Sequence, residues 1–413
     1  MQVFKFGGAS VKDANGVRNL VDILSKEQGD ILVVISAMGK MTNAFEKLIN
    51  VYFSNQDFSS ELQSIVDFHR KIIQNLDIQN CLFDEYLSLL EIELKKKVSD
   101  NYNYEYDRLI GFGELFSTII VWIYIRENVG GAAWVDVRDI IKTDSNYRFA
   151  KVNWKQTVQL AKQKIDFSKK RVFLTQGFIA SDLLGHSTSL GREGSDYSAA
   201  ILAYAFSAES ISIWKDVPGV LNVDPRLFDN PELLPELSFY DAIELAFFGA
   251  QVIHPKTIQP LKNKRIPLMV KSFENPNDKG TLVSHNKANI STPIVIIKNH
   301  QVLLSIRTRD FSFVDEKNLA SIFSVLSEFN AKVNMMQNGA VSFSVVVDFL
   351  PRLFDAMLKK ISIDFDVKYN SNLELITIRH YTKSKIDELL EDRTVYLEQK
   401  SRNTAQYLVD NNL

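Results

Sequence analysis

A strand–turn–helix unit occurs twice in succession at the start of the chain and restricts the folds that are open to it. The first unit predicts a buried strand over residues 2–6, a glycine turn at 7–8 and an amphipathic helix from near Ser10. The second predicts a strand over residues 30–37 and a further helix from about Met41. Because strands that alternate with helices pair in parallel, this order predicts an α/β domain with a parallel sheet.

The positions of the prolines shape the prediction for the middle of the chain. All ten prolines lie at or after Pro218, and a proline inside a helix breaks it. We therefore expect long, unbroken helices over residues 57–128, including one over 106–127. A buried strand from Arg171 is followed by a glycine-punctuated segment that predicts a hairpin and loop, and then by a helix from Ser195.

The C-terminal part has a different character. Turn-forming residues at 274–280 predict the end of the first domain. One βαββαβ unit is predicted after them, followed by a βαββ copy that stops before its second helix. The sequence therefore predicts a large first domain over residues 1–285, a second module over 295–370 and a truncated third module over 371–413.

The incomplete copy predicts an association between two chains. A truncated sheet leaves an unpaired strand edge and an apolar face, which proteins seldom leave open. The side chains that this face would expose are Leu375, Thr377, Val395 and Leu397. We therefore expect a homodimer formed by two C-terminal regions, because one surface then covers both edges. The alternative is a monomer whose tail folds back on its own first domain.

Composition excludes several classes of protein. The chain has 48 basic and 50 acidic side chains, and its net charge of −2 argues against a strongly basic nucleic-acid-binding protein. Its one cysteine, Cys81, can form no internal disulfide, and its six histidines show no pair at metal-ligand spacing. The apolar stretch 115–125 is too short to span a bilayer, and the N-terminus shows no signal-peptide pattern. These observations predict a cytoplasmic protein.

The segment KFGG at 5–8 places a lysine and two glycines where the first strand enters its turn. Backbone N–H groups at such a turn face an approaching anion, and glycines leave room for a phosphate. Lys5 can reach the same anion. The spacing is that of neither a P-loop nor a dinucleotide-binding fingerprint. Because paired glycines can also be turn geometry alone, the motif by itself leaves both interpretations open.

A glycine-flanked loop with the sequence LGREGSDYSAA, from Leu190, carries a second candidate site. Ser195 suits an N-cap and Asp196 suits the first turn of a helix, which explains both residues without a function. Arg192 has no such structural explanation. A guanidinium in this loop is free to clamp a carboxylate or a phosphate with two hydrogen bonds.

Two further acidic residues have unusual positions. Asp216 ends a buried strand before a Pro-Gly turn, where ligands bind open α/β sheets, and it can hold Mg²⁺ or orient a lysine. Glu114 lies inside an apolar helix, where a buried carboxylate needs a cationic partner or ligand. The alternative for Glu114 is a half-exposed helix edge. Asp224, before Pro225, is better explained as part of a turn.

Taken in this order, these segments resemble the aspartate kinases of the amino-acid kinase superfamily. The resemblance covers essentially residues 1–285, and the matching segments are 5–11, 34–43, 113–118, 136–138, 175–200, 213–226, 248–255 and 273–283. The tail is similar to the ACT regulatory modules that follow the kinase domain in this family. The implied fold is the carbamate-kinase-like αβα sandwich with a mostly parallel central sheet, followed by α+β ferredoxin-like ACT modules.

The resemblance implies transfer of the γ-phosphoryl group of ATP to the β-carboxylate of L-aspartate, with ATP and Mg²⁺ as cofactors. The product would be 4-phospho-L-aspartate, at the first step towards lysine, methionine and threonine. The residue types suit this chemistry, because an acceptor carboxylate is already ionised at about pH 7 and needs no general base. The difficulty is to bring an anion to a polyanion, which requires positioning and cations.

By match to the family's motifs, each candidate residue receives a role. Lys5 would contact the transferring phosphoryl group, and Asp216 would orient Lys5 near Mg²⁺, which ATP phosphates rather than a direct protein motif would carry. Arg192 would clamp a carboxylate of aspartate, and Glu114 would receive its ammonium. The residues that complete the aspartate pocket would be Ser36, Thr42, Ser195 and Asp196. The nucleotide would contact Lys5, Gly7, Gly8, Lys215, Asp216, Leu221, Arg226 and Gln251.

Three positions depart from the family's usual pattern. Glu193 replaces a glycine and must point away from the phosphates or lower the ATP affinity, Gln251 replaces a lysine, and Ala9 replaces a threonine. Two other functions stay open at this stage, namely a kinase for a glutamate-type substrate and a catalytically weakened sensor that binds amino acids. The sequence does not identify which end product, if any, inhibits the enzyme.

Overall fold

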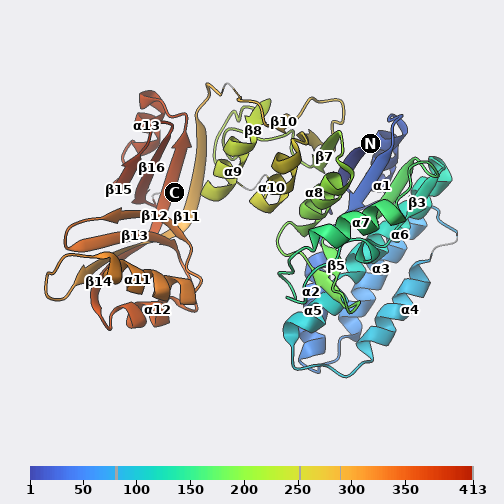
Figure 1. Ribbon diagram of the computed structural model, residues 1–413, viewed down its shortest axis with the longest axis horizontal. Helices are drawn as coiled ribbons and strands as arrows, with labels where there is room; N and C mark the ends of the chain where they lie inside the picture. The colour runs from blue at the N-terminus through green and yellow to red at the C-terminus, as the bar shows by residue number, and fades with distance from the viewer. Residues whose placement is uncertain (80–81, 251–252, 289, 412–413) are drawn as a thin grey trace. The chain divides into compact units, whose positions relative to one another are not determined.

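The computed structural model describes residues 1–79, 82–250, 253–288 and 290–411 (Figure 1). The chain forms two compact units. The first contains residues 1–220, 233–246 and 251–289, and the second contains 221–232, 247–250 and 290–413. Two short segments that precede residue 285 in the sequence therefore belong to the second unit.

The first unit is built around an eight-stranded sheet of order β3-β4-β2-β1-β7-β9-β10-β8. Its strands are β1 (Gln2–Phe6), β2 (Ile31–Ile35), β3 (Ala132–Trp134), β4 (Val172–Gln176), β7 (Ser210–Lys215), β8 (Glu236–Ser238), β9 (Leu268–Ser272) and β10 (Thr281–Ser284). Neighbouring strands are parallel except for β9 and β10. The predicted mostly parallel sheet is confirmed. The predicted hairpin is also present, as β5 (Ile179–Ser181) and β6 (Ser187–Ser189).

Helices cover both faces of this sheet and complete an αβα sandwich. On β1, β2 and β7 packs α8 (Gly194–Phe206), flanked by α7 (Trp154–Lys164) and α10 (Pro255–Lys264). On β2, β3 and β4 packs α6 (Phe112–Asn128), beside α1 (Ala14–Ser25), α2 (Met41–Phe53) and α4 (Phe83–Leu94). The remaining helices of this unit are α3 (Ser59–Asn75), α5 (Tyr102–Ile110), the 3-10 turn η1 (Val137–Asp139) and α9 (Phe239–Phe248). Because both faces are shielded, every residue of β2 is at most 1% exposed.

The structure corrects two predicted helix boundaries. The first helix begins at Ala14 and not near Ser10, because the side chain of Asp13 caps it by accepting a hydrogen bond from Gly16 N at 2.9 Å. The helix predicted over 106–127 is two helices, α5 and α6, which are separated at Gly111. Glycine is a weak helix former, and the absence of proline from this region was not sufficient to predict continuity.

The stretch Tyr102–Asn128, which contains α5 and α6, is long and apolar enough to cross a membrane by length and composition alone. In this fold, 83% of its 18-residue apolar window is buried. A helix that is apolar on all sides and packed within a folded unit has these properties. The position of α6 against β2, β3 and β4 accounts for its composition.

The second unit contains a six-stranded antiparallel sheet of order β12-β13-β11-β14-β16-β15. Its first six elements are β11 (Ile294–Thr308), α11 (Glu316–Glu328), β12 (Val333–Asn338), β13 (Ser342–Asp348), α12 (Phe354–Ile361) and β14 (Phe365–Arg379). They are followed by α13 (Lys383–Leu390), β15 (Val395–Lys400) and β16 (Thr404–Asp410). The predicted βαββαβ order and its incomplete βαββ copy are confirmed.

The two copies share their long central strands, which the sequence did not predict. Residues 294–298 of β11 pair with 375–379 of β14, and β14 pairs with β16 on its other side. The incomplete copy therefore joins one six-stranded sheet, whose edge strands are β12 and β15. The expected exposed apolar face is wrong at Leu375 and Thr377, which are 2% and 1% exposed. Leu375 packs inside the unit in a cluster that contains Leu303, Val346 and Leu408. Val395 is 41% exposed.

Candidate active site

The carboxyl ends of three neighbouring strands carry residues that the sequence singled out. Lys5 on β1 is aligned with Val34 of β2 on one side and with Ile213 of β7 on the other. Ser36 directly follows β2, and Lys215 is the last residue of β7. Because the three strands are parallel, these ends lie at one edge of the sheet, at the point where the strand order reverses. Open α/β sheets bind their ligands at this point.

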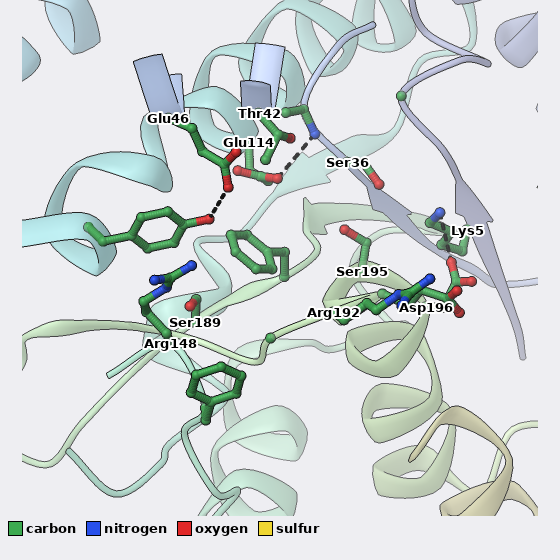
Figure 2. Close-up of a pocket in the computed structure, with 18 of the residues that line it drawn as sticks. Lys5, Ser36, Thr42, Glu46, Glu114, Arg148, Ser189, Arg192, Ser195 and Asp196 are labelled. Carbon is green, nitrogen blue, oxygen red and sulfur yellow. Dashed lines mark hydrogen bonds and ion pairs between the residues drawn. The ribbon is translucent and has the colours of Figure 1, made fainter. Parts of the chain in front are cut away.

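A cavity of about 630 Å³ lies at this edge of the sheet (Figure 2). Side chains and backbone from the glycine turn of β1, the segment after β2, α6 and the loop before α8 line it. Of the candidate residues, those that line the cavity are Lys5, Gly8, Ser36, Thr42, Glu114, Arg192, Ser195, Asp196 and Lys215. The fold thus brings into one cavity the residues that the sequence placed in separate motifs.

A buried ion-pair cluster occupies one side of the cavity. The Nζ atom of Lys5 lies 2.7 Å from Oδ1 of Asp196, and the Nζ atom of Lys215 lies 3.7 Å from Oδ2. Lys5 is 7% exposed and Asp196 is 3% exposed. Burial raises the pKa of Asp196, but the two lysines outweigh it and hold the pKa below the usual range. Asp196, and not the predicted Asp216, is therefore the carboxylate that orients Lys5.

Glu114 is a buried carboxyl that forms no ion pair with any of the described residues. Its Oε1 accepts a hydrogen bond from the backbone N–H of Ala37 at 3.3 Å, and its Oε2 is buried without a hydrogen-bond partner in the described part of the chain. Burial raises its pKa from 4.5 to about 8. The alternative of a half-exposed helix edge is wrong, because Glu114 is 3% exposed. An unpartnered carboxyl oxygen in a cavity wall suits a ligand that brings an ammonium.

The loop before α8 turns sharply into the cavity wall. Glu193 occupies the N-cap position with φ of 54°, in the left-handed region, and its side chain makes no cap hydrogen bond. The predicted N-cap role of Ser195 is wrong, because the N-cap is Glu193, two residues earlier, and the helix starts at Gly194. Ser195 and Asp196 lie in the first turn, where the helix dipole favours a bound anion.

Glu193 also lines the cavity. Its Oε2 is buried and has no hydrogen-bond partner among the residues that the structure describes. A carboxylate at this position adds negative charge beside the first turn of α8. The expected penalty on ATP affinity stays a prediction.

Gly8 allows two turns of the chain to touch. Its carbonyl oxygen accepts a hydrogen bond from Gly39 N at 2.9 Å, which joins the turn after β1 to the turn after β2. A Cβ atom at Gly8 would lie 2.6 Å from the carbonyl oxygen of Ala37 and 2.8 Å from that of Gly39. These distances are closer than carbon and oxygen approach, so any side chain here would push the two turns apart.

Several cavity residues were not predicted from the sequence. They are Gly39, Glu46, Tyr106, Arg148, Phe149, Phe178 and Ser189. Glu46 and Tyr106 lie on helices of ordinary amphipathic pattern, and Arg148 lies in a polar loop, so no local signal distinguishes them. Only the packing of α2, α5 and the 145–150 loop around one cavity identifies them.

Some predicted residues do not join this group. Gly7 and Asp216 do not line the cavity. Leu221 and Arg226 belong to the second unit, where the guanidinium of Arg226 is paired with Asp224 through an Nη2–Oδ2 contact of 2.6 Å. Asp224 lies in a turn, as predicted. Gln251 lies outside the described residues. The nucleotide-binding roles of these residues stay predictions.

The described residues contain no group of three or more His, Cys, Asp or Glu side chains that is placed to hold a metal ion. Among the carboxylates at the cavity, Asp196 is occupied by two lysines. The donor set therefore does not form a cation site of its own. A divalent cation at this cavity would depend on oxygen ligands that a substrate brings.

Comparison with known proteins finds one matching family model and several similar sequences. The model of the amino acid kinase family matches residues 1–272. The chain is 32% identical over 353 residues to the lysine-sensitive aspartokinase 3 of Escherichia coli, covering 84% of this chain and 78% of that protein. It is 33% identical over 364 residues to the chloroplastic aspartokinase 1 of Arabidopsis thaliana, covering 84% of this chain and 63% of that protein.

Solved structures resemble the fold over nearly the whole chain. The structure of E. coli aspartokinase III in complex with aspartate and ADP matches with a TM-score of 0.83 and 28% identity, covering 99% of this chain and 96% of that one. The aspartate kinase of Clostridium acetobutylicum matches with a TM-score of 0.83 at 22% identity, with the same coverage. At that identity the second match supports the fold alone.

Proposed function

The chain belongs to the amino acid kinase family and, within it, to the aspartokinases, and from this premise we propose that it transfers the γ-phosphoryl group of ATP to the β-carboxylate of L-aspartate. The products are 4-phospho-L-aspartate and ADP. The observation that carries the proposal is one cavity that joins the lysine pair on Asp196 to the unpartnered carboxyl of Glu114. Figure 2 shows Lys5 and Asp196 on one side of this cavity and Glu114 with Thr42 on another.

The lysine cluster supplies the positive charge that phosphoryl transfer requires. Two ammonium groups against one carboxylate give the cluster a net positive charge. Because Asp196 stays ionised, it fixes the Lys5 ammonium at the carboxyl end of β1. A cation that is held in place and shielded from water stabilises charge on a phosphoryl group more than a mobile surface lysine does.

Glu114 and Arg192 suit the two charges of the amino-acid acceptor. In the empty cavity, burial keeps the Glu114 carboxyl protonated at neutral pH. An arriving ammonium favours its ionised form, so the acceptor's amino group would displace that proton. The Arg192 guanidinium would hold a carboxylate of the acceptor with two parallel hydrogen bonds. Ser36, Thr42 and Ser195 line the same cavity.

For the nucleotide and Mg²⁺ we propose a region of the cavity and fewer individual contacts than for the acceptor. ATP would place its phosphates at Lys5, Lys215 and the first turn of α8, with Mg²⁺ bound mainly to the phosphates. When bound, Mg²⁺ neutralises charge on the transferring and leaving oxygens. Contacts from Gly7, Asp216, Leu221, Arg226 and Gln251 to the nucleotide belong to this proposal.

We also propose where the enzyme acts, which biosynthetic step it catalyses and how it assembles. We place it in the cytoplasm, early in the biosynthesis of lysine, threonine and methionine, and we expect a homodimer formed through the second unit. Support for the dimer now comes from the edges of the six-stranded sheet, β12 and β15, rather than from the face that carries Leu375.

The decisive experiment measures the reaction on the full chain. The purified protein is supplied with ATP, Mg²⁺ and either L-aspartate or L-glutamate, and ADP release is followed together with trapping of the acyl phosphate by hydroxylamine. We expect ADP and hydroxamate to form in equal amounts with aspartate, and at least about tenfold more slowly with glutamate. ADP release that does not depend on aspartate, or equal use of glutamate, would contradict the proposal.

A further inference from the structure

Part of the cavity carries charged residues that the proposed phosphoryl transfer does not use. Glu46, Tyr106 and Arg148 line it, and we call these three residues the Arg148 subsite. Figure 2 shows Glu46 and Arg148 on the side of the cavity away from Lys5 and Asp196.

Arg148 is held at the cavity wall at both its backbone and its side chain. Its backbone has φ of 69°, in the left-handed region that residues other than glycine seldom occupy. The backbone N–H of Arg148 donates to Oδ2 of Asp107 at 2.8 Å, and Asp107 also accepts from Ser189 N at 2.8 Å and from Ser189 Oγ at 2.6 Å. The guanidinium carbon lies 4.3 Å from the centroid of the Tyr106 ring.

The guanidinium of Arg148 is left without an anionic partner. In the ranges that the structure describes, no carboxylate lies at ion-pair distance from it. Arg108 provides a contrast, because its guanidinium also lies over a tyrosine ring but is paired with Glu93 and Glu105. A positioned guanidinium with unused N–H donors in a cavity wall is a receptor for a carboxylate or another planar anion.

Glu46 supplies the opposite charge in the same subsite. Its Oε1 accepts a hydrogen bond from the hydroxyl of Tyr106 at 2.8 Å, so one tyrosine ring orients both charged groups. Among the ion pairs of the described residues there is none between Glu46 and Arg148. A cation and an anion that are fixed near each other and do not pair fit a ligand that carries both charges and can bridge them.

We propose that the Arg148 subsite binds the zwitterionic α-amino acid group of a free amino acid, with the carboxylate on Arg148 and the ammonium on Glu46. Its residues differ from Glu114 and Arg192, which the proposed function assigns to the acceptor, although all of them line one cavity. Its occupant is either a second molecule of the acceptor amino acid or a different free amino acid, because both carry the same pair of charges. An occupant here would share the cavity with the acceptor and would change its apparent affinity.

The test measures binding to the full chain by calorimetry in the absence of ATP. L-Aspartate is titrated first, to count the molecules that bind per chain. L-Alanine, which carries the zwitterion but no second carboxylate, is then titrated into protein saturated with L-aspartate. We expect either two aspartates per chain, which identifies the acceptor as the occupant, or one aspartate and a further alanine, which identifies another amino acid.

Variants assign the extra site to its residues. Arg148→Gln and Glu46→Gln should each weaken binding at the extra site by about tenfold or more, the effect of losing a charge-assisted hydrogen bond. The matched control is Arg126→Gln, which removes an exposed guanidinium that lies 4.8 Å from the centroid of the Trp122 ring. It should leave the extra site unchanged. Because Arg148→Gln can disturb the loop, Glu46→Gln, on a separate helix, provides an independent measure.

Two results would overturn the inference. One is a single aspartate per chain with no binding of alanine to the aspartate complex. The other is an extra site whose affinity is the same in Arg148→Gln, Glu46→Gln and the unaltered chain. The outcome is independent of the proposed function, because binding is measured without turnover. A chain that forms ADP with aspartate but shows no extra site would keep its function and lose this subsite.

Discussion

A cluster of three alternating charges lies at one side of the cavity. Asp196 lies between Lys5 and Lys215; Lys5 and Asp196 are buried, and the side chain of Lys215 is 20% exposed. Removing one cation from such a cluster would leave a buried carboxylate partly uncompensated, which costs more than losing a surface ion pair. Substitution of Lys5 is therefore expected to lower both the stability of the folded chain and the rate of phosphoryl transfer.

The first prediction concerns Lys5. If its ammonium stabilises the transferring phosphoryl group, Lys5→Ala should lower kcat by at least about a hundredfold, the effect of losing one positioned electrostatic contact. The KM for ATP should change much less. Lys47→Ala, at a lysine whose side chain is 73% exposed, is the control. Steady-state kinetics measure both parameters. A Lys5→Ala enzyme that keeps most of its kcat would show that the KFGG segment forms a turn and does not take part in phosphoryl transfer.

The second prediction concerns Arg192. A guanidinium can hold a carboxylate with two parallel hydrogen bonds, whereas a lysine offers a point charge. Arg192→Lys should therefore raise the KM for aspartate by about tenfold or more and change the KM for ATP little. Measuring both KM values on one preparation separates these effects. Equal effects on the two substrates would place Arg192 at the phosphates.

The third prediction concerns the pH dependence of stability at Glu114. Its pKa is raised from 4.5 to about 8 in the folded chain, so between these values the native state holds a proton that the unfolded state has released. Stability from this group is therefore fully present below about pH 4.5 and is lost as pH rises through about 8, on the order of 5 kcal/mol in total.

Glu114→Gln should remove this loss, because the amide does not titrate. Thermal unfolding of the ligand-free chain from pH 5 to pH 8.5 should show the unaltered chain falling relative to Glu114→Gln as pH rises. Glu127→Gln, at a side chain that is 46% exposed, is the control and should behave as the unaltered chain does. Parallel pH profiles for all three chains would show that Glu114 has an ordinary pKa.

At the scale of the elements, the site depends on the contact between the turn after β1 and the turn after β2, which meet at Gly8 and Gly39. The fourth prediction concerns this contact. A methyl group at Gly8 would overlap the carbonyl oxygens of Ala37 and Gly39, so Gly8→Ala should lower stability by about 1–3 kcal/mol and also lower kcat. Gly29→Ala meets no atom within 4 Å and is the control. Denaturant unfolding measures the first effect, and equal stability of the two variants would contradict the close contact.

Local patterns predicted most of the elements and singled out the residues of the ion-pair cluster, because their signals are contiguous in the sequence. Lys5 precedes its own glycine turn, and Arg192 and Asp196 share one short loop. The partner of Lys5 was assigned to Asp216 because a strand end is visible in the sequence and the packing of α8 against β1 is not. The sequence predicts an N-cap at Ser195, because a left-handed conformation of Glu193 cannot be predicted from residue type.

Longer-range features were not predictable in the same way. The N-terminal half of β11 pairs with residues 375–379, and nothing near Ile294 indicates that partner. Arg148 and Glu46 come from a loop and a helix whose sequences carry no motif. Their common position follows from the packing of separate elements around Tyr106, which residue types alone do not specify.

At the scale of the whole molecule, the two units are not contiguous stretches of sequence. The second unit takes Val223 and Phe228 into a core cluster with Val295 and Ile376, and the backbone N–H of Val295 donates to the carbonyl of Asn222 at 2.8 Å. A chain cut after residue 284 would expose this apolar segment. Experiments on the second unit are therefore best made on the full chain.

The last prediction concerns the assembly of two chains through the second unit. Among the described residues, the six-stranded sheet ends at β12 and β15, each of which pairs with a neighbour on one side only. Five of the six residues of β15 are exposed, including Val395 at 41% and Tyr396 at 40%, whereas β12 is partly buried. An exposed edge with apolar side chains is a template for pairing with a second copy.

We therefore expect the full chain to sediment as a dimer at micromolar concentration. Val395→Lys places a charge on the β15 edge and should weaken the dimer by about tenfold or more, because an edge lysine opposes strand pairing. Met336→Lys, at a residue of β12 that is 52% exposed, is the matched change at the other edge and should leave the dimer intact. A full chain that sediments as a monomer would refute the dimer, and dissociation by Met336→Lys alone would move the interface to β12. Because neither residue lies in the cavity of the first unit, a loss of dimer with unchanged aspartate-dependent turnover would separate assembly from catalysis.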